Sequence, residues 1–174
     1  FSRALGFSNT NNPKAAEKEL DILITLRNGL IKNKDSYAAG QVTIQINATK
    51  AWIEFAKGNS EKAITFMQLA VALESKTSKA PVTPGELVPA SELLGNLYLA
   101  SNQPEKALET YKLNLELHPL RFNGIYGAAK AAIELNKTTE AIYYFDQLVR
   151  LSTAVKSNRP EVAEAKAFLK NQQT

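Results

Sequence analysis

The stretch LLGNLYLASNQPEKALETYKLNLELHP, residues 93–119, decides the fold because part of it returns further along the chain. Its segment PEKALETYKLNL, residues 104–115, matches TTEAIYYFDQLV, residues 138–149, and the match places Ala107 and Ala141 34 residues apart. A period of this length is typical of a solenoid unit made of two helices. The sequence therefore predicts an all-α stack of antiparallel helix pairs.

Small side chains at matching places of these segments are predicted to lie where two helices cross. Gly95, Ala107, Ala129 and Ala141 lack bulk, and a helix can approach a neighbour closely at such positions. The space beside them needs large side chains if the core is to be filled without voids. The aromatic residues at the neighbouring positions are Tyr111 and Phe145.

The repeats are predicted near residues 44–76, 91–120 and 121–152, and about three units is the minimum that stacks stably. A final helix near residues 159–171 is expected to cap the open end of the core. The expected architecture is a right-handed superhelical solenoid that forms one domain over residues 1–174. FSRALGF at the start reads as a helix already under way, so we expect a fragment of a longer chain.

The stretch 93–119 is similar to a tetratricopeptide repeat (TPR) unit, and residues 50–151 resemble bacterial TPR proteins. In those proteins a PVTPG loop precedes the LLG helix and an RFN-x-x-x-GAA-x-AA segment follows it, as PVTPGELVPASELLG and RFNGIYGAAKAA do here. The small and aromatic positions spaced as in a TPR unit are Leu94, Gly95, Tyr98, Ala107, Tyr111 and Pro119. The departures are Ser91 in place of tryptophan, Asn102 and Asn136 in place of a turn glycine, and Asn114 in place of alanine.

Helix boundaries are expected where capping residues meet apolar periodicity. Asn12 before Pro13 predicts a long amphipathic helix, and Asp35 or Ser36 is expected to cap the next helix. The apolar residues of the first of these helices are Ala16, Leu20, Ile22, Leu23, Leu26 and Leu30. The stretch VTIQIN, residues 42–47, alternates as a strand does, but it has no second strand to pair with and is predicted to be helical.

The next helix is expected to follow Gly58, which ends the preceding one, and to be capped by Ser60. Its predicted buried stripe consists of Ala63, Ile64, Met67, Leu69, Ala70 and Leu73. Beyond it, the spacing from Ala63 to Ala107 is 44 residues instead of 34, and the surplus predicts a proline-rich loop over residues 77–89. Two roles stay open for this loop: a gate over a binding site, or a rigid spacer.

Composition excludes several classes of function. Lys and Arg number 21 against 17 acids, but they are scattered, so nucleic-acid binding is not predicted. No apolar run is long enough for a membrane span. The single histidine, His118, precedes a helix-ending proline and reads as a cap, and without cysteine or a second histidine no metal site or cofactor is predicted. The compartment stays open between cytoplasmic and exported.

The resemblance to TPR proteins implies that the first helices of the repeats line a concave groove. Aromatic anchors beside amide and ammonium groups suit recognition of a peptide or protein segment. The groove residues implied by the resemblance are Trp52, Phe55, Asn96, Leu99, Asn123, Tyr126, Lys130 and Ile133. Trp52 and Tyr126 also fit a second interpretation as core between repeats. Arg121 is interpreted as a local partner of helix ends rather than as a contact for an acidic partner.

The function predicted from these observations is a non-catalytic protein-interaction module without cofactor or metal. Its expected partner is a protein or peptide bound in the groove. No isolated carboxylate pair or phosphate-binding loop indicates an enzyme. Two alternatives stay open: a structural or homo-oligomerisation scaffold, and an accessory domain of an enzyme encoded upstream.

Overall fold

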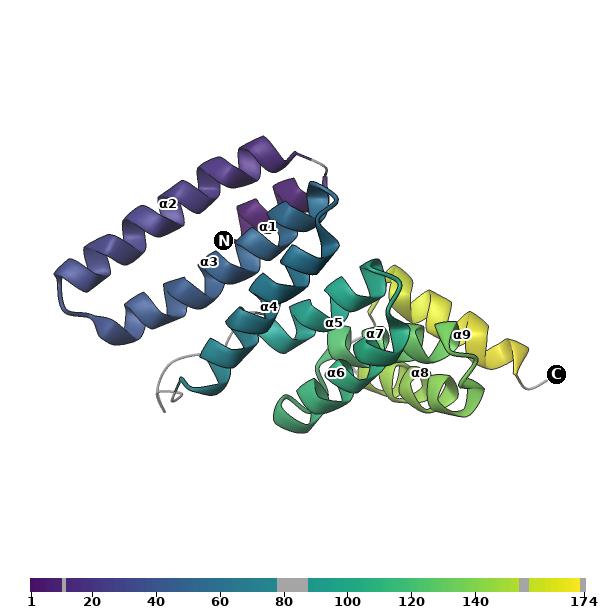
Figure 1. Ribbon diagram of the computed structural model, residues 1–174. Coiled ribbons are helices and arrows are strands. Elements are labelled where there is room, and N and C mark those ends of the chain that lie inside the picture. Colours follow the sequence, from purple (N-terminus) through teal and green to yellow (C-terminus); the bar gives the residue numbers. More distant parts are fainter. Residues whose placement is uncertain (11, 78–87, 154–156, 173–174) are drawn as a thin grey trace. The chain divides into compact units, whose positions relative to one another are not determined.

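The computed structural model describes residues 1–10, 12–77, 88–153 and 157–172 (Figure 1). Every regular element in these ranges is an α-helix, which confirms the all-α prediction. The helices are α1 (Ser2–Asn9), α2 (Pro13–Lys32), α3 (Ser36–Ala56), α4 (Ser60–Ser75), α5 (Ala90–Ala100), α6 (Pro104–Leu117), α7 (Phe122–Glu134), α8 (Thr138–Thr153) and α9 (Pro160–Asn171).

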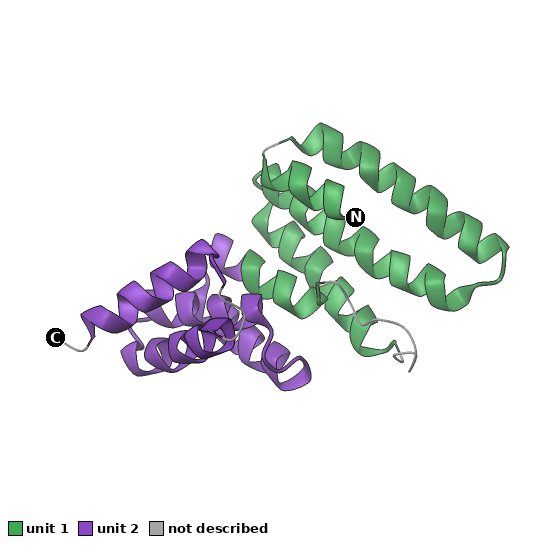
Figure 2. Cartoon of the chain, turned by 180° about the vertical axis from the view of Figure 1, so that it is seen from behind, with its two compact units in different colours: residues 1–97 green, residues 98–174 purple. Residues whose placement is uncertain are grey.

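The chain forms two compact units, residues 1–97 and residues 98–174, and the boundary falls within α5 (Figure 2). In unit 1, α3 packs against both α2 and α4, and α1 packs against α2 and α3. In unit 2, α6, α7, α8 and α9 pack each against the next. Packing between sequential neighbours joined by short turns is the arrangement expected of helix pairs.

Side-chain caps begin α2 and α3 as the sequence predicts. The side chain of Asn12 accepts a hydrogen bond from the Ala15 amide at 3.2 Å, and Asp35 accepts one from the Ala38 amide at 2.9 Å. Each bond satisfies an amide that has no partner within its helix. The predicted cap of α4 by Ser60 is wrong, because Asn59 is the N-cap residue there and makes no side-chain cap bond.

The stretch 42–47 is helical, which confirms the choice against a strand. Val42, Ile44 and Ile46 are all buried although no single helix face holds all three. The reason is that α3 packs between α2 and α4, so apolar side chains point to more than one neighbour. One cluster of the unit 1 core joins Leu23 of α2 to Val42 and Ile46 of α3.

The buried stripe of α4 is narrower than the sequence predicts. Ala63, Met67 and Ala70 are fully buried, whereas the Leu69 and Leu73 side chains are 49% and 38% exposed. At about 100° per residue, Leu69 and Leu73 lie roughly 80° to 160° around the helix from Ala63 and Met67. The prediction that these two leucines belong to the core is therefore wrong.

The small residues of unit 2 lie where the sequence places them. Ala107, Ala129 and Ala141 are fully buried, and Tyr111 and Phe145 fill the adjoining space with no exposed surface. The sequence did not single out the closest approach, which is at Gly127 of α7. A Cβ atom built on Gly127 would lie 2.2 Å from Cζ of Tyr111, which is too close for any side chain at this position. The packing of Tyr111 of α6 against α7 therefore requires glycine here.

Left-handed backbone residues join the two helices of each pair. Gly58, Asn102 and Asn136 have φ angles of 84°, 55° and 56°, and they occupy the same place in successive repeats. Asparagine tolerates this conformation better than most other residues, which explains why it replaces the turn glycine. The predicted loop at 77–89 lies for the most part outside the described residues, and with it the choice between gate and spacer.

Candidate peptide-binding face

Helix α7 presents one polar face that contains four of the predicted groove residues. Asn123, Tyr126, Lys130 and Ile133 follow one another at spacings of three and four residues, so they lie on one side of the helix. Asn123 is exposed, and the other three are partly buried. The opposite side consists of buried glycine and alanine residues and Ile125, which fixes the direction in which the polar face points.

Glu164 of α9 joins two of these side chains. The Tyr126 hydroxyl donates to one carboxylate oxygen at 2.5 Å, and the Lys130 ammonium lies 2.7 Å from the other. The hydrogen bond from Lys130 holds the pKa of the Glu164 carboxyl below its usual range, and the bond from Tyr126 adds to this effect. Burial raises the pKa of the Tyr126 hydroxyl, and its bond to the Glu164 carboxylate raises it further. Both groups are therefore in their ordinary protonation states at neutral pH.

Arg159, just before α9, makes the corresponding contact at the start of α7. Its guanidinium donates to the Asn123 side-chain oxygen at 3.1 Å and pairs with Glu161 at 2.9 Å. The same group lies 3.8 Å above the centre of the Phe122 ring, a cation–π contact. Asn123, Tyr126 and Lys130 are thus held by residues of the segment 159–164, and their geometry is fixed before any partner binds.

Glu164 and Arg159 were not among the residues predicted for this face. The repeat period could have indicated Glu164, because this residue follows Lys130 by 34 residues, one repeat length. Extending the repeat beyond residue 152 makes α9 the first helix of a further unit instead of only a cap. First helices of successive units are neighbours in such stacks.

The remaining predicted groove residues divide between the units. Trp52 of α3 is only 8% exposed, and its ring meets that of Phe55 edge to face at 5.7 Å. A ring buried to this extent stabilises unit 1, in line with the core interpretation of Trp52. Asn96 and Leu99 of α5 are partly buried, the first in unit 1 and the second in unit 2.

Helix-end residues occupy the places expected of them. His118 is the C-cap residue of α6, and its backbone amide donates to the Asn114 carbonyl at 2.8 Å. Arg121 is the N-cap residue of α7. Both positions agree with local roles at the ends of helices.

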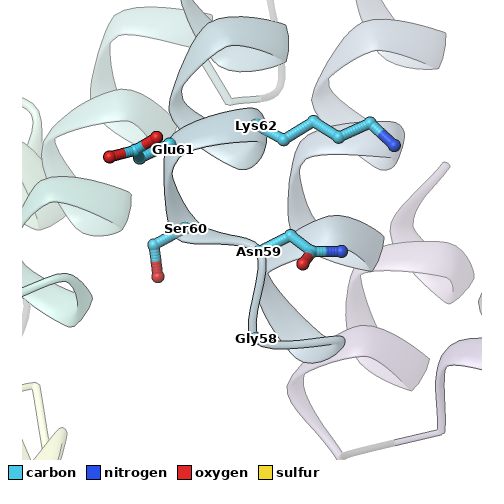
Figure 3. A pocket seen from close by; sticks show the side chains of 5 residues that line it. All are labelled: Gly58, Asn59, Ser60, Glu61 and Lys62. Atoms are coloured by element: carbon cyan, nitrogen blue, oxygen red, sulfur yellow. The ribbon is translucent and has the colours of Figure 1, made fainter.

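The turn between α3 and α4 forms a shallow surface depression of about 430 Å³ lined by Gly58, Asn59, Ser60, Glu61 and Lys62 (Figure 3). Two of its polar side chains, Asn59 and Lys62, contact the same carboxylate. Glu54 accepts a hydrogen bond from Asn59 at 3.0 Å and lies 3.1 Å from the Lys62 ammonium, and this contact lowers the pKa of Glu54. All five lining residues come from one consecutive stretch of the chain, so the depression does not bring polar groups of separate elements together around a ligand.

Sites of two other kinds are absent from the described residues. Histidine, aspartate and glutamate side chains in these ranges nowhere gather in a group of three or more that could hold a metal ion. None of the helices in the same ranges is both long enough and apolar enough to cross a membrane.

Comparison with known proteins agrees with the helical-repeat fold. Residues 44–77, which comprise the C-terminal part of α3 and the whole of α4, match the sequence model of the tetratricopeptide repeat. A search of the curated proteins found no matching sequence.

Solved structures share the fold at low sequence identity. PcrH from Pseudomonas aeruginosa is 16% identical, with a TM-score of 0.59 over 76% of this chain and 92% of its own. The TPR-like repeats of a putative kinesin light chain from Podosopora anserina are 17% identical, with a TM-score of 0.64 over 97% of this chain and 81% of theirs. A second structure, of a variant of the same repeats, is 18% identical, with a TM-score of 0.63 over 97% of this chain and 80% of its own.

The TPR fold is a general scaffold for protein–protein interaction, and proteins built on it typically carry out no catalysis. Residues 44–77 thus match a tetratricopeptide repeat, and the all-helical architecture with its packing of sequential helices has the fold of TPR-like solved structures.

Proposed function

We propose that the protein is a non-catalytic interaction module that binds a peptide or protein segment along the first helices of its repeats. The observation that carries the proposal is the polar face of α7, where amide, phenol and ammonium groups stand in one row. Lys130 and Glu164 have side chains that are 37% and 40% exposed, so a partner can reach them. An extended peptide offers the amides and carbonyls that such groups bind.

The contacts with the segment 159–164 support this role through preorganisation. A side chain already held in one rotamer loses less conformational entropy when a partner binds, and this raises the affinity gained per contact. Asn123, Tyr126 and Lys130 meet this condition, because each is bonded to Arg159 or Glu164.

The charge distribution favours a protein partner over a nucleic acid. Many basic groups are already paired with carboxylates, and a phosphate backbone would have to displace these. The pairs among the described residues are Arg3 with Glu19, Lys57 with Glu17 and Glu54, Lys62 with Glu54, Lys112 and Lys137 with Glu140, Lys130 with Glu164, Arg150 with Asp146 and Arg159 with Glu161.

A selection from a displayed random-peptide library tests the proposal with the full chain as bait. Peptides that bind the α7 face should lose at least about tenfold in affinity on Asn123→Ala or Lys130→Met, a loss of about 1.4 kcal/mol. Glu61→Gln, an exposed change in unit 1, is the matched control and should leave the affinity unchanged. Circular dichroism confirms that each variant stays helical.

Two results would count against the proposal. One is a selection that yields no specific binder, and the other is a set of binders whose affinity is unaffected by both substitutions on α7. Binders that respond to Glu61→Gln instead would place the site on another face.

A further inference from the structure

Glu164 of α9 balances the charge of the ammonium group on the α7 face. Lys130 lies 2.7 Å from one of its carboxylate oxygens, and the Tyr126 hydroxyl donates to the other at 2.5 Å. The Lys130 and Glu164 side chains are 37% and 40% exposed, so both charges stand where a partner would bind. An ammonium group has three N–H donors, and Lys130 therefore keeps donors for a partner although its charge is already balanced.

The charges around this pair also sum to zero. The two segments that form the face, residues 121–134 and 159–164, contain three basic and three acidic side chains. The Arg159 guanidinium holds Glu161 through two hydrogen bonds, at 2.9 Å and 3.3 Å. The other lysines of α9, Lys166 and Lys170, lie about 160° and 120° around the helix from Glu164 and thus on other sides of it. The six charged side chains of the face are Arg121, Lys130, Arg159, Glu134, Glu161 and Glu164.

A partner carboxylate gains little at Lys130 while Glu164 is ionised. Two oxygens bound to one ammonium nitrogen at about 2.8 Å, with a tetrahedral angle between them, lie about 4.5 Å apart. Because Coulomb energy falls as the inverse of distance, repulsion by Glu164 then cancels about 60% of the attraction by Lys130. The remaining attraction has to offset the loss of water from the incoming carboxylate, which is costly for a charged group.

An uncharged oxygen meets no such opposition at the same place. A backbone carbonyl or a side-chain amide has no net charge for Glu164 to repel, and it gives up its water at a much lower cost. It can still accept a hydrogen bond from Lys130. The pair of Lys130 and Glu164 therefore favours a neutral acceptor over an acidic one, and a like charge placed against the wrong partner is one way in which proteins obtain specificity.

From this geometry we infer that Glu164 determines the specificity of the α7 face by excluding carboxylates from Lys130. The partner is a segment that places a backbone carbonyl, or the side-chain oxygen of an asparagine or glutamine, at this lysine. The inference rests on the proposed function, because it concerns the same face. It adds the class of partner and the residue that selects it.

Selection from a displayed random-peptide library on two full-length baits, the wild type and Glu164→Gln, tests the inference. Glutamine keeps the size of the side chain and an oxygen that can accept from Tyr126, but it carries no charge. Binders that lose affinity on Lys130→Met report on this lysine. Those selected on the wild type should lack aspartate and glutamate at the position that contacts it, and those selected on Glu164→Gln should be enriched in them.

A charge exchange in the peptide gives the decisive measurement. Glutamine in a wild-type binder is replaced by glutamate at the position that contacts Lys130, and both peptides are titrated against both baits. The glutamate peptide should not gain affinity for the wild type, but it should gain at least about tenfold for Glu164→Gln relative to it. Adding Lys130→Met to Glu164→Gln should abolish this gain. Glu61→Gln, which makes the same change in net charge in unit 1, should bind both peptides as the wild type does.

Salt separates an effect of charge from a change in the shape of the face. The glutamate peptide should bind Glu164→Gln more weakly as salt rises from about 0.05 M to 0.5 M, because a lysine without a paired carboxylate attracts it. The glutamine peptide should lose much less affinity for the wild type. A gain on Glu164→Gln that does not depend on salt would contradict the inference.

The outcomes distinguish this inference from the proposed function. Wild-type binders enriched in acidic residues at the position that contacts Lys130 would overturn the inference alone, as would a glutamate peptide that gains nothing on Glu164→Gln. A library without specific binders, or binders indifferent to both Asn123→Ala and Lys130→Met, would overturn the proposed function and the inference with it. Circular dichroism checks that every variant stays helical.

Discussion

At Gly127 a hydrogen atom occupies the place where any other amino acid would carry a Cβ atom. The Tyr111 ring, which would meet that Cβ at 2.2 Å, is fully buried, so its displacement would disturb the packing around it. Gly127→Ala should therefore lower the free energy of unfolding by up to about 2 kcal/mol. An overpacking cost of about 1–3 kcal/mol outweighs the gain of about 1 kcal/mol in helix propensity. Urea unfolding of the two proteins measures the difference.

Gly40→Ala is the matched control for this substitution. Gly40 lies inside α3, and a Cβ built on it meets no atom within 4 Å. Here the propensity gain stands alone and should raise stability by about 0.5–1 kcal/mol. Equal effects of the two alanines would mean that contact with Tyr111 does not set the role of Gly127.

The sequence was sufficient to predict that Gly95, Ala107 and Ala141 are buried, because small residues that recur at a fixed period are typical of helix crossings. It was not sufficient for Gly127. A glycine within a run of small residues gives no sign of which neighbouring ring it touches. That contact depends on the crossing of α6 and α7, and only the structure supplies it.

Helix α2 begins with a side-chain cap, and α4 begins with the same residue type without one. Asn12→Ala removes the hydrogen bond to the Ala15 amide and should cost about 1 kcal/mol. Asn59→Ala removes no cap bond, only an exposed contact with Glu54, and should cost about 0.5 kcal/mol or less. Thermal unfolding of both variants compares the two costs. An equal loss in both would argue against the cap as the cause.

The contact between α7 and α9 should depend on pH through Glu164. Its pKa is lowered in the folded protein, chiefly by Lys130, so its contribution is complete above the unfolded pKa of about 4 and is lost as pH falls below it. Glu164→Gln should therefore cost about 0.5 kcal/mol at pH 7, a value reduced for the exposure of both side chains. The cost should shrink as pH falls below about 4 and the carboxylate takes up a proton.

Measurement of unfolding free energies from pH 3 to pH 7 checks this expectation. Glu134→Gln is the control, since Glu134 is exposed and forms no ion pair among the described residues. A deficit for Glu164→Gln that stays constant with pH would show that the carboxylate charge does not stabilise the contact.

At the scale of helices, the apolar periodicity of the sequence predicted the presence of helices correctly. It was less reliable in predicting which side of each helix is buried. It predicted the helix over residues 42–47 correctly, but it wrongly assigned Leu69 and Leu73 to the core. An apolar residue shows that a helix has a hydrophobic side, and the number of neighbouring helices decides how wide that side is. On α4, Ala63, Met67 and Ala70 face the core, and the two leucines extend beyond it.

The two compact units should respond separately to local damage. Gly127→Ala weakens the packing of α6 on α7, which both belong to unit 2. Since packing in such arrays is mainly between neighbouring helices, amide hydrogen exchange should quicken in residues 98–174 more than in residues 1–97. Mass spectrometry after exchange and digestion resolves the two ranges. Equal acceleration throughout would show that the chain opens as one cooperative whole.

For the whole molecule, the repeat period predicted the helical stack, because small and large side chains recur at matching positions and pack the helices of each unit in the same way. The candidate face was predicted only in part. Asn123, Tyr126 and Lys130 lie together on α7, but their partners Arg159 and Glu164 come from a segment that was interpreted only as a cap. Sequence spacing places residues on one helix, whereas contacts between helices depend on tertiary packing.

The burial of Trp52 makes natural fluorescence selective for one half of the chain. It is the single tryptophan in the sequence, and it lies in the core of residues 1–97, so its emission shifts to the red when water reaches that half. Calorimetry, in contrast, records heat absorbed by both halves. The difference between the midpoint temperatures of the fluorescence and calorimetric melting curves therefore measures how strongly the two halves are coupled, without any added dye or label.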